Sequence, residues 1–244
     1  ALTAEGTAYL AEVQSALQSL VASTTRLQRR SRESVLRLST VSMAAHEFLL
    51  PRLQDFHACF PGIELRIEAS NTLVDFKLSD FDAALRVGHG WPELRVHALG
   101  TATVAAVCAP KLAAAIRCTA DLCEHTLLDP SGDGQRALRA ALEQCGVSPL
   151  QAARVWHFET CFDALRAAEH GLGVTFAVFP VATHLVTSGR LAVPLADRLA
   201  LPGQVCFVHR PQDQRFPFAD IAAWMSQQYR SLPQLPSGRV VPQL

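Results

Sequence analysis

Three hydroxyl-bearing side chains stand at the carboxyl end of the first extended segment of the sequence. Residues 35–41, VLRLSTV, alternate as a strand does, and Ser39, Thr40 and Ser42 close the segment. Parallel α/β sheets bind ligands beyond the carboxyl ends of their strands, and a following helix offers unpaired N–H groups and a partial positive charge. We therefore expect Ser42 to contact an acidic small molecule.

The same arrangement recurs later in the chain. Thr160 and Cys161 lie between a predicted strand at 155–159 and a predicted helix at 159–171 that ends at glycine. Two helix N-termini facing each other across a cleft would hold an acidic metabolite without any lysine. The alternative is that Ser42 and Thr160 only cap their helices, and the two roles are compatible.

Motifs for catalysis and metal binding are incomplete. His46-Glu47 begins like a zinc-protease helix, but Leu50 stands where the second histidine ligand belongs. Gly88-His89-Gly90 begins like a dinucleotide-binding loop, but Glu93 replaces the third glycine. No two histidines stand three or four residues apart on a predicted helix. We therefore expect no metal, no cofactor and no enzymatic activity.

The remaining acidic and thiol groups favour structural roles. Asp75, Asp80 and Asp82 gather around a turn and could serve as acid–base groups, although helix capping and surface charge are the favoured interpretation. The seven cysteines are odd in number and no two have the spacing of a zinc or redox motif. They indicate reduced thiols in a cytoplasmic protein.

Composition excludes several classes of protein. The 22 basic and 22 acidic side chains give a formal net charge of 0, and 49% of the chain is hydrophobic. A disordered chain would be less hydrophobic, and a nucleic-acid-binding domain would carry a basic surplus. There is no apolar run of the roughly 20 residues that a membrane span needs, and no secretory signal pattern.

The first 33 residues predict a coiled-coil helix. Apolar residues and one threonine recur at steps of 3, 4, 3, 4 and 3 within a segment that lacks proline, and polar residues fall between them. A narrow seam of this kind suits one partner helix, so we expect dimerisation through Leu10, Val13, Leu17, Leu20, Thr24 and Leu27. The alternative is a helix that lies on its own globular body.

The rest of the chain predicts two α/β lobes. A strand at 35–41, a helix at 42–60 with Pro51 inside it and a strand at 61–69 form a βαβ unit with parallel strands. We expect lobe I over 34–103 and 204–232, lobe II over 104–203, and a loosely ordered tail over 233–244. Further strands are predicted at 81–88, 102–110, 126–129, 172–178, 190–194 and 203–209, and further helices at 110–116, 134–145, 180–189 and 216–229.

Several segments together resemble the LysR-type bacterial transcriptional regulators. The opening ALTAEG, the segment VLRLSTVSMAAHEFLLPRLQDFHACFPGIELRIEAS, the segment ALRAAEHGLGVTFAVFP and the late GRLAVPL are similar to that family in order and spacing. LVDFKLSDFDAALRVGHG and VCAPKL resemble its glycine-cleavage-activator and β-lactamase-regulator branch. The resemblance covers residues 1 to about 232.

The resemblance implies a type 2 periplasmic-binding-protein-like effector domain after a dimerisation helix. It implies a homodimer, with a homotetramer as a further assembly, a small-molecule inducer, contact with RNA polymerase, and promoter DNA bound through a winged helix-turn-helix that this chain, starting at Ala1, does not contain. Carried over by position, the inducer contacts fall on Ser42, Met43, Ser70, Asn71, Gly88, His89, Thr160, Cys161 and Phe207. Met43 replaces a hydroxyl residue common in the family, which argues against a strongly polar inducer.

Two other classes share a two-lobed cleft. A solute-binding protein of a transporter would need export, for which no signal is seen. An enzyme such as a dehydratase or a tetrapyrrole-forming deaminase would need a cleft carboxylate or lysine, and the two lysines, Lys77 and Lys111, are not clearly placed at strand ends.

Overall fold

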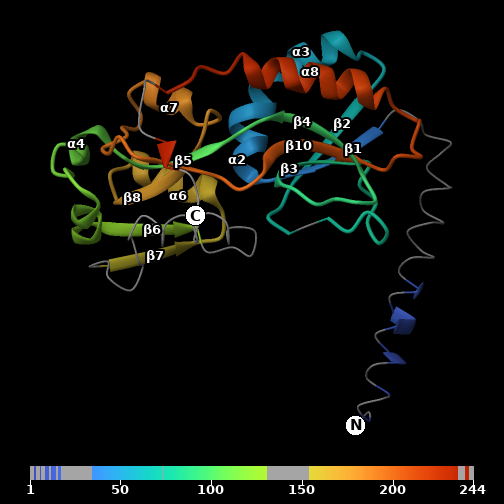
Figure 1. Ribbon diagram of the computed structural model, residues 1–244, viewed down its shortest axis with the longest axis horizontal. Coiled ribbons are helices and arrows are strands. Elements are labelled where there is room, and N and C mark those ends of the chain that lie inside the picture. The colour runs from blue at the N-terminus through green and yellow to red at the C-terminus, as the bar shows by residue number, and fades with distance from the viewer. Residues whose placement is uncertain are drawn as a thin grey trace.

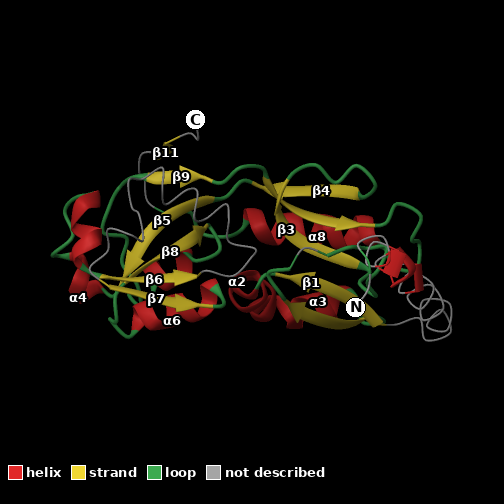
Figure 2. Cartoon of the chain, turned by 90° about the horizontal axis from the view of Figure 1, so that it is seen from below, coloured by secondary structure: helices red, strands yellow, loops and turns green. Residues whose placement is uncertain are grey.

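The computed structural model describes residues 35–72, 74–130, 154–235 and 240–241, together with isolated positions between 3 and 17. Within these residues the strands form a five-stranded sheet and a six-stranded sheet. The two sheets lie side by side along the long axis of the molecule, with the short helix α2 between them (Figure 2). The chain is therefore a two-lobed α/β protein, as the sequence predicts.

The first sheet has the strand order β2-β1-β3-β10-β4. The predicted βαβ unit is confirmed, because β1 pairs in parallel with β2, with Leu38 opposite Ile67, and in parallel with β3 on its other side. β10 enters antiparallel between β3 and β4. The sequence pattern does not predict β4. The strands are β1 (Val35–Thr40), β2 (Glu64–Ala69), β3 (Ala83–Gly88), β4 (Arg95–Gly100) and β10 (Gln204–His209).

The helical run after β1 changes its winding around Pro51. It begins as α2 (Ser42–Ala44), widens to a π-helix at Ala45–Leu49, tightens to a 3-10 turn at Leu50–Arg52 and ends as α3 (Leu53–Cys59). Proline cannot donate to the carbonyl four residues earlier, and its ring crowds that carbonyl. The predicted helix at 42–60 is thus present, but it departs from regular α-helix where the proline disturbs its ladder.

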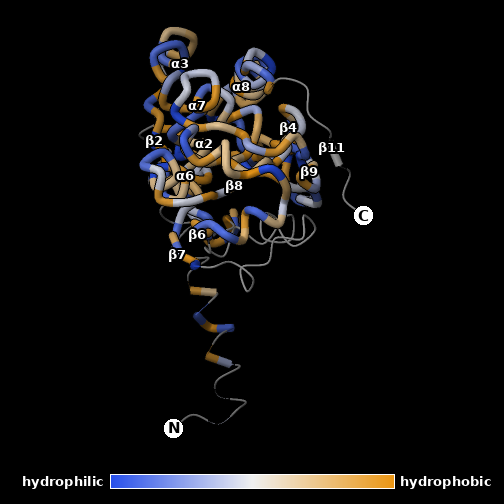
Figure 3. Tube along the Cα trace, turned by 90° about the vertical axis from the view of Figure 1, so that its left-hand side faces the viewer, coloured by the Kyte–Doolittle hydropathy of each residue, from blue (hydrophilic) through white to orange (hydrophobic). Residues whose placement is uncertain are grey.

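The last long helix packs beside α3. This helix, α8 (Phe218–Arg230), lies with α3 on the same side of the strands, and hydrophilic and hydrophobic stretches alternate along both (Figures 1 and 3). The Trp224 Nε1–H donates to a carboxylate oxygen of Asp55 at 2.7 Å, and the Gln228 amide donates to the same oxygen at 2.8 Å. These bonds fix the two helices over the sheet that carries β1 and β3.

The second sheet has the strand order β11-β9-β5-β8-β6-β7. Its strands are β5 (Thr103–Cys108), β6 (Thr126–Pro130), β7 (Arg154–Phe158), β8 (Val174–Phe179), β9 (Arg198–Ala200) and β11 (Val240–Val241). The helical segments around it are α4 (Pro110–Ala113), a 3-10 helix at Thr119–Glu124, α6 (Cys161–Glu169) and α7 (Thr183–Thr187). The predicted helix at 134–145 lies outside the described residues.

One strand prediction in this lobe is wrong. Residues 190–194 do not form a strand; only Ala192 bonds to the sheet, exchanging both backbone hydrogen bonds with Cys108. Pro194 has no N–H to continue such a ladder. The strand of this region is β9, which lies a few residues later and pairs antiparallel with β5.

Two of the connections between the lobes lie side by side. The crossings follow β4 and β9, and they lie together, because the Leu201 N–H donates to the Ala102 carbonyl at 2.9 Å. The Tyr229 hydroxyl of α8 donates to the carbonyl of Thr101 in the first crossing, at 2.7 Å. Apolar side chains of both lobes form a continuous core through this region. The junction is therefore packed and is not a free linker.

The two ends of the chain bear on two predictions. Within 233–244, for which a loose tail is predicted, Leu235 is buried and β11 pairs in parallel with β9. Near the start, the described positions between 6 and 17 have helical backbone, and Leu10 and Leu17 are exposed. Three positions of the predicted seam, Leu20, Thr24 and Leu27, lie outside the described residues.

Candidate functional site

A cavity of about 530 Å³ lies where the two lobes meet. Its volume falls within the range of roughly 300–1,000 Å³ that small-molecule sites occupy. Its wall includes Ser42 just after β1 and Gly88 at the end of β3, so the carboxyl ends of two neighbouring parallel strands open into it. This is where an α/β sheet presents its ligand crevice.

Most of the lining is apolar. Side chains from both lobes and from the second crossing surround the cavity, and the Trp91 ring lies so close to Gly88 that a Cβ there would be 3.4 Å from it. A surface of this kind favours the apolar body of a ligand. The main aliphatic members are Met43, Leu85, Val178, Val181, Leu201 and Val205.

The polar side chains of the lining are few and include no carboxylate. They are Ser42, Asn71, Arg86 and His89. The Ser42 hydroxyl is buried and has no hydrogen-bond partner, and Ser42 does not cap the helix that follows. A buried hydroxyl without a partner costs free energy, and a ligand can offset that cost.

Arg86 is the buried cation of this wall. Its Nη2 donates to the Ser39 hydroxyl at 2.8 Å and to the carbonyls of Ser70 and Thr72 at 3.2 and 3.3 Å. The residue is 6% exposed, and burial lowers its pKa to about 10. Arg86 therefore holds the loop after β2 against β1 and β3, and it remains charged at neutral pH.

Six of the nine predicted ligand contacts line the cavity. They come from three strand ends of lobe I and from the start of α6 in lobe II. Positions far apart in the sequence thus line one cavity. The six residues are Ser42, Met43, Asn71, Gly88, His89 and Cys161.

The other three predicted contacts are placed elsewhere. The Ser70 hydroxyl accepts from the Thr72 N–H at 3.1 Å. Thr160 caps α6, accepting from the Asp163 N–H at 3.1 Å and donating to the Asp163 carboxylate at 2.6 Å. Phe207 is fully buried in the core. None of the three is among the residues that line the cavity.

Side chains of the two lobes contact each other beside the cavity. The Asn71 amide donates to the Glu159 carbonyl at 3.1 Å, and the Cys161 thiol lies 3.9 Å from the Met43 sulfur. Two further contacts join the helical run after β1 to lobe II: the His46 ring stacks on Phe162, and Glu47 pairs with His184 at 2.7 Å. These contacts hold the two lobes together beside the cavity.

The described lining residues include no recognisable catalytic set. Burial raises the pKa of the Cys161 thiol to about 12, so it is not a nucleophile at neutral pH. Neither Lys77 nor Lys111 is among the residues that line it. Among the described residues no cluster of three potential metal ligands occurs, and no helix is long and apolar enough to cross a membrane.

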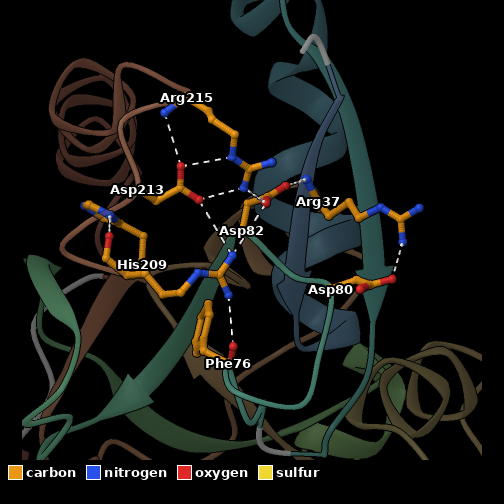
Figure 4. Close-up of polar contacts among 8 residues, drawn as sticks. Arg37, Phe76, Asp80, Asp82, His209, Asp213 and Arg215 are labelled. Atoms are coloured by element: carbon orange, nitrogen blue, oxygen red, sulfur yellow. Dashed lines mark hydrogen bonds and ion pairs between the residues drawn. The ribbon is translucent and has the colours of Figure 1, made fainter. Parts of the chain in front are cut away.

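The predicted acidic cluster lies away from the cavity and is structural. Asp82 is buried; its carboxylate accepts from the Arg37 N–H at 2.8 Å and pairs with Arg215 (Figure 4). Arg215 also pairs with Asp213 at 2.6 Å. This network joins β1 and β3 to the segment between β10 and α8. Asp75 and Asp80 do not line the cavity either.

Arg86 and Trp91 are lining residues that the sequence analysis does not predict. Arg86 is the single charged residue of AALRVG (83–88), and a lone charge of this kind is typical of a solvent-facing position in an alternating strand. A lone charge in an apolar strand does not by itself distinguish a buried arginine from a solvent-facing one. Nothing in the pattern around Trp91 distinguishes it from a loop anchor.

Two α/β lobes joined by paired crossings surround this cavity, an architecture in which a small molecule could contact both lobes. The family model for the LysR substrate binding domain matches residues 29–230. The chain therefore belongs to the LysR family through its substrate-binding domain.

Curated relatives and solved structures agree with this membership. The chain is 33% identical over 202 residues to the glycine cleavage system transcriptional activator of Escherichia coli K12, covering 81% of this chain and 66% of that protein. It is 29% identical over 203 residues to the transcriptional activator AmpR of Citrobacter freundii, covering 82% and 69%. The effector domain of AmpR from Pseudomonas aeruginosa superposes with a TM-score of 0.65 at 28% identity, covering 81% of this chain and 96% of that one.

Proposed function

We propose that this chain is the effector-binding and pairing region of a LysR-type transcriptional regulator. The observation that carries the proposal is the cavity between the lobes, into which Ser42, Gly88 and Cys161 converge from three separate elements. A small molecule there would contact both lobes at once. If it binds one lobe arrangement better than another, it shifts the population of the two arrangements.

The contacts between the lobes are the interactions that a shift between lobe arrangements would break or form. The Asn71–Glu159 and Glu47–His184 contacts both span the junction, so opening the lobes breaks them. A ligand that fills the cavity adds contacts only to the closed form. We propose that, in the whole regulator, the resulting change in lobe geometry reaches promoter DNA through a DNA-binding domain and also affects contact with RNA polymerase. We place the whole regulator in the cytoplasm.

The binding proposal is tested by a thermal-shift screen of the full chain against amino acids, aromatic acids and cell-wall fragments. Ser42→Phe fills the cavity and should abolish the shift given by any hit. Ser188→Phe is the matched control, because Ser188 is exposed and does not line the cavity. A hit that binds both variants equally would move the site elsewhere.

We further propose that the N-terminal helix pairs two copies of the chain. Leu10 and Leu17, one heptad apart, are 42% and 56% exposed, and burying such side chains in a partner helix is favourable. The double variant Leu10→Lys with Leu17→Lys should shift the mass in light scattering from dimer towards monomer. Gln14→Lys, at an exposed polar position of the same helix, is the control. An unchanged mass in the double variant would refute pairing through this seam.

A further inference from the structure

Arg86 is a buried cation whose hydrogen-bond partners among the described residues are all neutral. Its four hydrogen bonds go to one hydroxyl and three backbone carbonyls, at 2.8–3.3 Å. Among the described residues no carboxylate forms an ion pair with it. A buried charge is usually paired with an opposite charge, because neutral acceptors replace only part of its hydration. The wall of the cavity thus carries a positive charge that no carboxylate among the described residues balances.

Two buried polar atoms in the same wall also lack a partner. They are the Nε of Arg86 and the hydroxyl oxygen of Ser42, and both residues are more than nine-tenths buried. Nε carries a proton that it can only donate, and a hydroxyl can donate as well. Two unmatched donors on residues that line one cavity, one of them part of a guanidinium cation, are suited to an acceptor that is itself negatively charged.

The other lining residues indicate the polarity of the rest of the ligand. Met43, Leu201 and Val205 are apolar, and Trp91 offers an aromatic surface. Aspartate and glutamate are missing from the described lining residues, so none of these would pair with a ligand ammonium. An apolar body is therefore favoured over a zwitterion or a sugar.

We propose that the cavity binds a monocarboxylic acid with an aliphatic or aromatic body, its carboxylate on the side of Arg86 and Ser42. The proposal rests on the proposed function of the cavity as the effector site, and it adds the chemical class of the effector. It also gives Arg86 a role beyond holding the 70–72 loop. The charge recognises the ligand, while the carbonyl bonds keep the guanidinium in place.

Matched acid and amide pairs test the class. The probes are 4-methylpentanoate with 4-methylpentanamide and 3-phenylpropanoate with 3-phenylpropanamide, titrated calorimetrically into the full chain at neutral pH. Each pair keeps the body and removes only the charge. Charge-assisted hydrogen bonds are about twice as strong as neutral ones, so we expect each acid to bind at least about tenfold more tightly than its amide.

Variants of the wall assign the preference to named groups. Arg86→Gln should bring the acid-to-amide ratio to about one, and Arg86→Lys, which keeps the charge, should retain a preference. Ser42→Ala should weaken acid binding severalfold. It removes only a hydroxyl and therefore keeps the test available if Arg86→Gln does not fold. Arg66→Gln removes an equal charge from an exposed position of β2 outside the cavity and should change nothing.

The outcomes separate this proposal from the proposed function. Amides that bind as tightly as acids, or a wild-type chain that binds none of the four probes, overturn the carboxylate class. The cavity as a binding site then still stands if another small molecule shifts the melting temperature and Ser42→Phe abolishes that shift. An acid preference unchanged in Arg86→Gln, Arg86→Lys and Ser42→Ala overturns the assignment of the head-group site.

Discussion

Replacing Gly203 with alanine should destabilise the protein and distort the cavity. Gly203 lies in the second crossing with φ +85°, and a Cβ added there would be 2.5 Å from the carbonyl carbon of Gly88. That neighbour is backbone and belongs to the cavity wall, so no side-chain rotation can relieve the overlap. The alanine would push the crossing and the end of β3 apart.

The expected magnitude has two parts. A residue with a Cβ in the left-handed region costs about 1–2 kcal/mol, and forced overlap in a packed site adds about 1–3 kcal/mol. Gly189→Ala isolates the first part, because Gly189 has φ +74° and nothing within 4 Å of its added Cβ. We therefore expect the free energy of unfolding to fall by about 1 kcal/mol for Gly189→Ala and by about 3 kcal/mol for Gly203→Ala.

Urea denaturation followed by far-UV circular dichroism measures both losses. The entropy that alanine removes from the unfolded chain is similar in the two variants and cancels in their comparison. Equal losses for Gly203→Ala and Gly189→Ala would show that the crossing does not press on Gly88, and would refute the view that this contact positions the cavity wall.

Three further predictions concern the buried polar and thiol groups. Asp82→Asn should cost about 2–3 kcal/mol in urea denaturation, because it leaves two partly buried guanidinium groups, Arg210 and Arg215, with only one of the two carboxylates that they share. Asp80→Asn, at a more exposed pair, should cost under about 0.5 kcal/mol. Similar losses for the two variants would contradict this prediction. Cys161, buried and with its pKa raised to about 12, should resist an aromatic disulfide reagent at pH 8 while exposed Cys59 reacts, as mass spectrometry of the labelled chain would show. Burial disfavours the Asp213 carboxylate, but its arginine partners outweigh burial and lower the pKa below 3.8. Its stabilisation is therefore full above pH 3.8 and is lost as pH falls through the native pKa, so Asp213→Asn should flatten the acid-side fall in melting temperature.

Residue periodicity predicts the parallel strands of lobe I because polar and apolar residues alternate regularly along those strands. VLRLST alternates cleanly, and β1 forms where the alternation lies. β4 is different: its first two residues, Arg95 and Val96, are exposed, so no buried face marks it before β10 pairs with it. The short β9 depends on its partner β5 in the same way. Strands whose pairing comes from distant segments leave little local trace.

The site shows the same division. Ser42 follows the end of β1, and that position alone predicts it at the ligand crevice, whereas Gly88, the last residue of β3, is predicted there through the family resemblance. Phe207 depends on which face of β10 points to the core, and a shift of one residue reverses that face. Arg86 could not be recognised because its buried setting is created by the loop carbonyls that fold over it, which sequence spacing does not reveal.

The position of β10 in the first sheet affects the order in which the protein can fold during its synthesis. β10 separates β3 from β4, yet the ribosome makes it only after all of β5 to β9. A nascent chain that has emerged to residue 200 therefore carries two strands of the first sheet with no neighbour between them. Unpaired strand edges invite pairing with other chains. Lobe II, whose strands other than β11 are by then complete, can fold first and bring the two crossings together, so that β10 inserts at its gap as soon as it emerges.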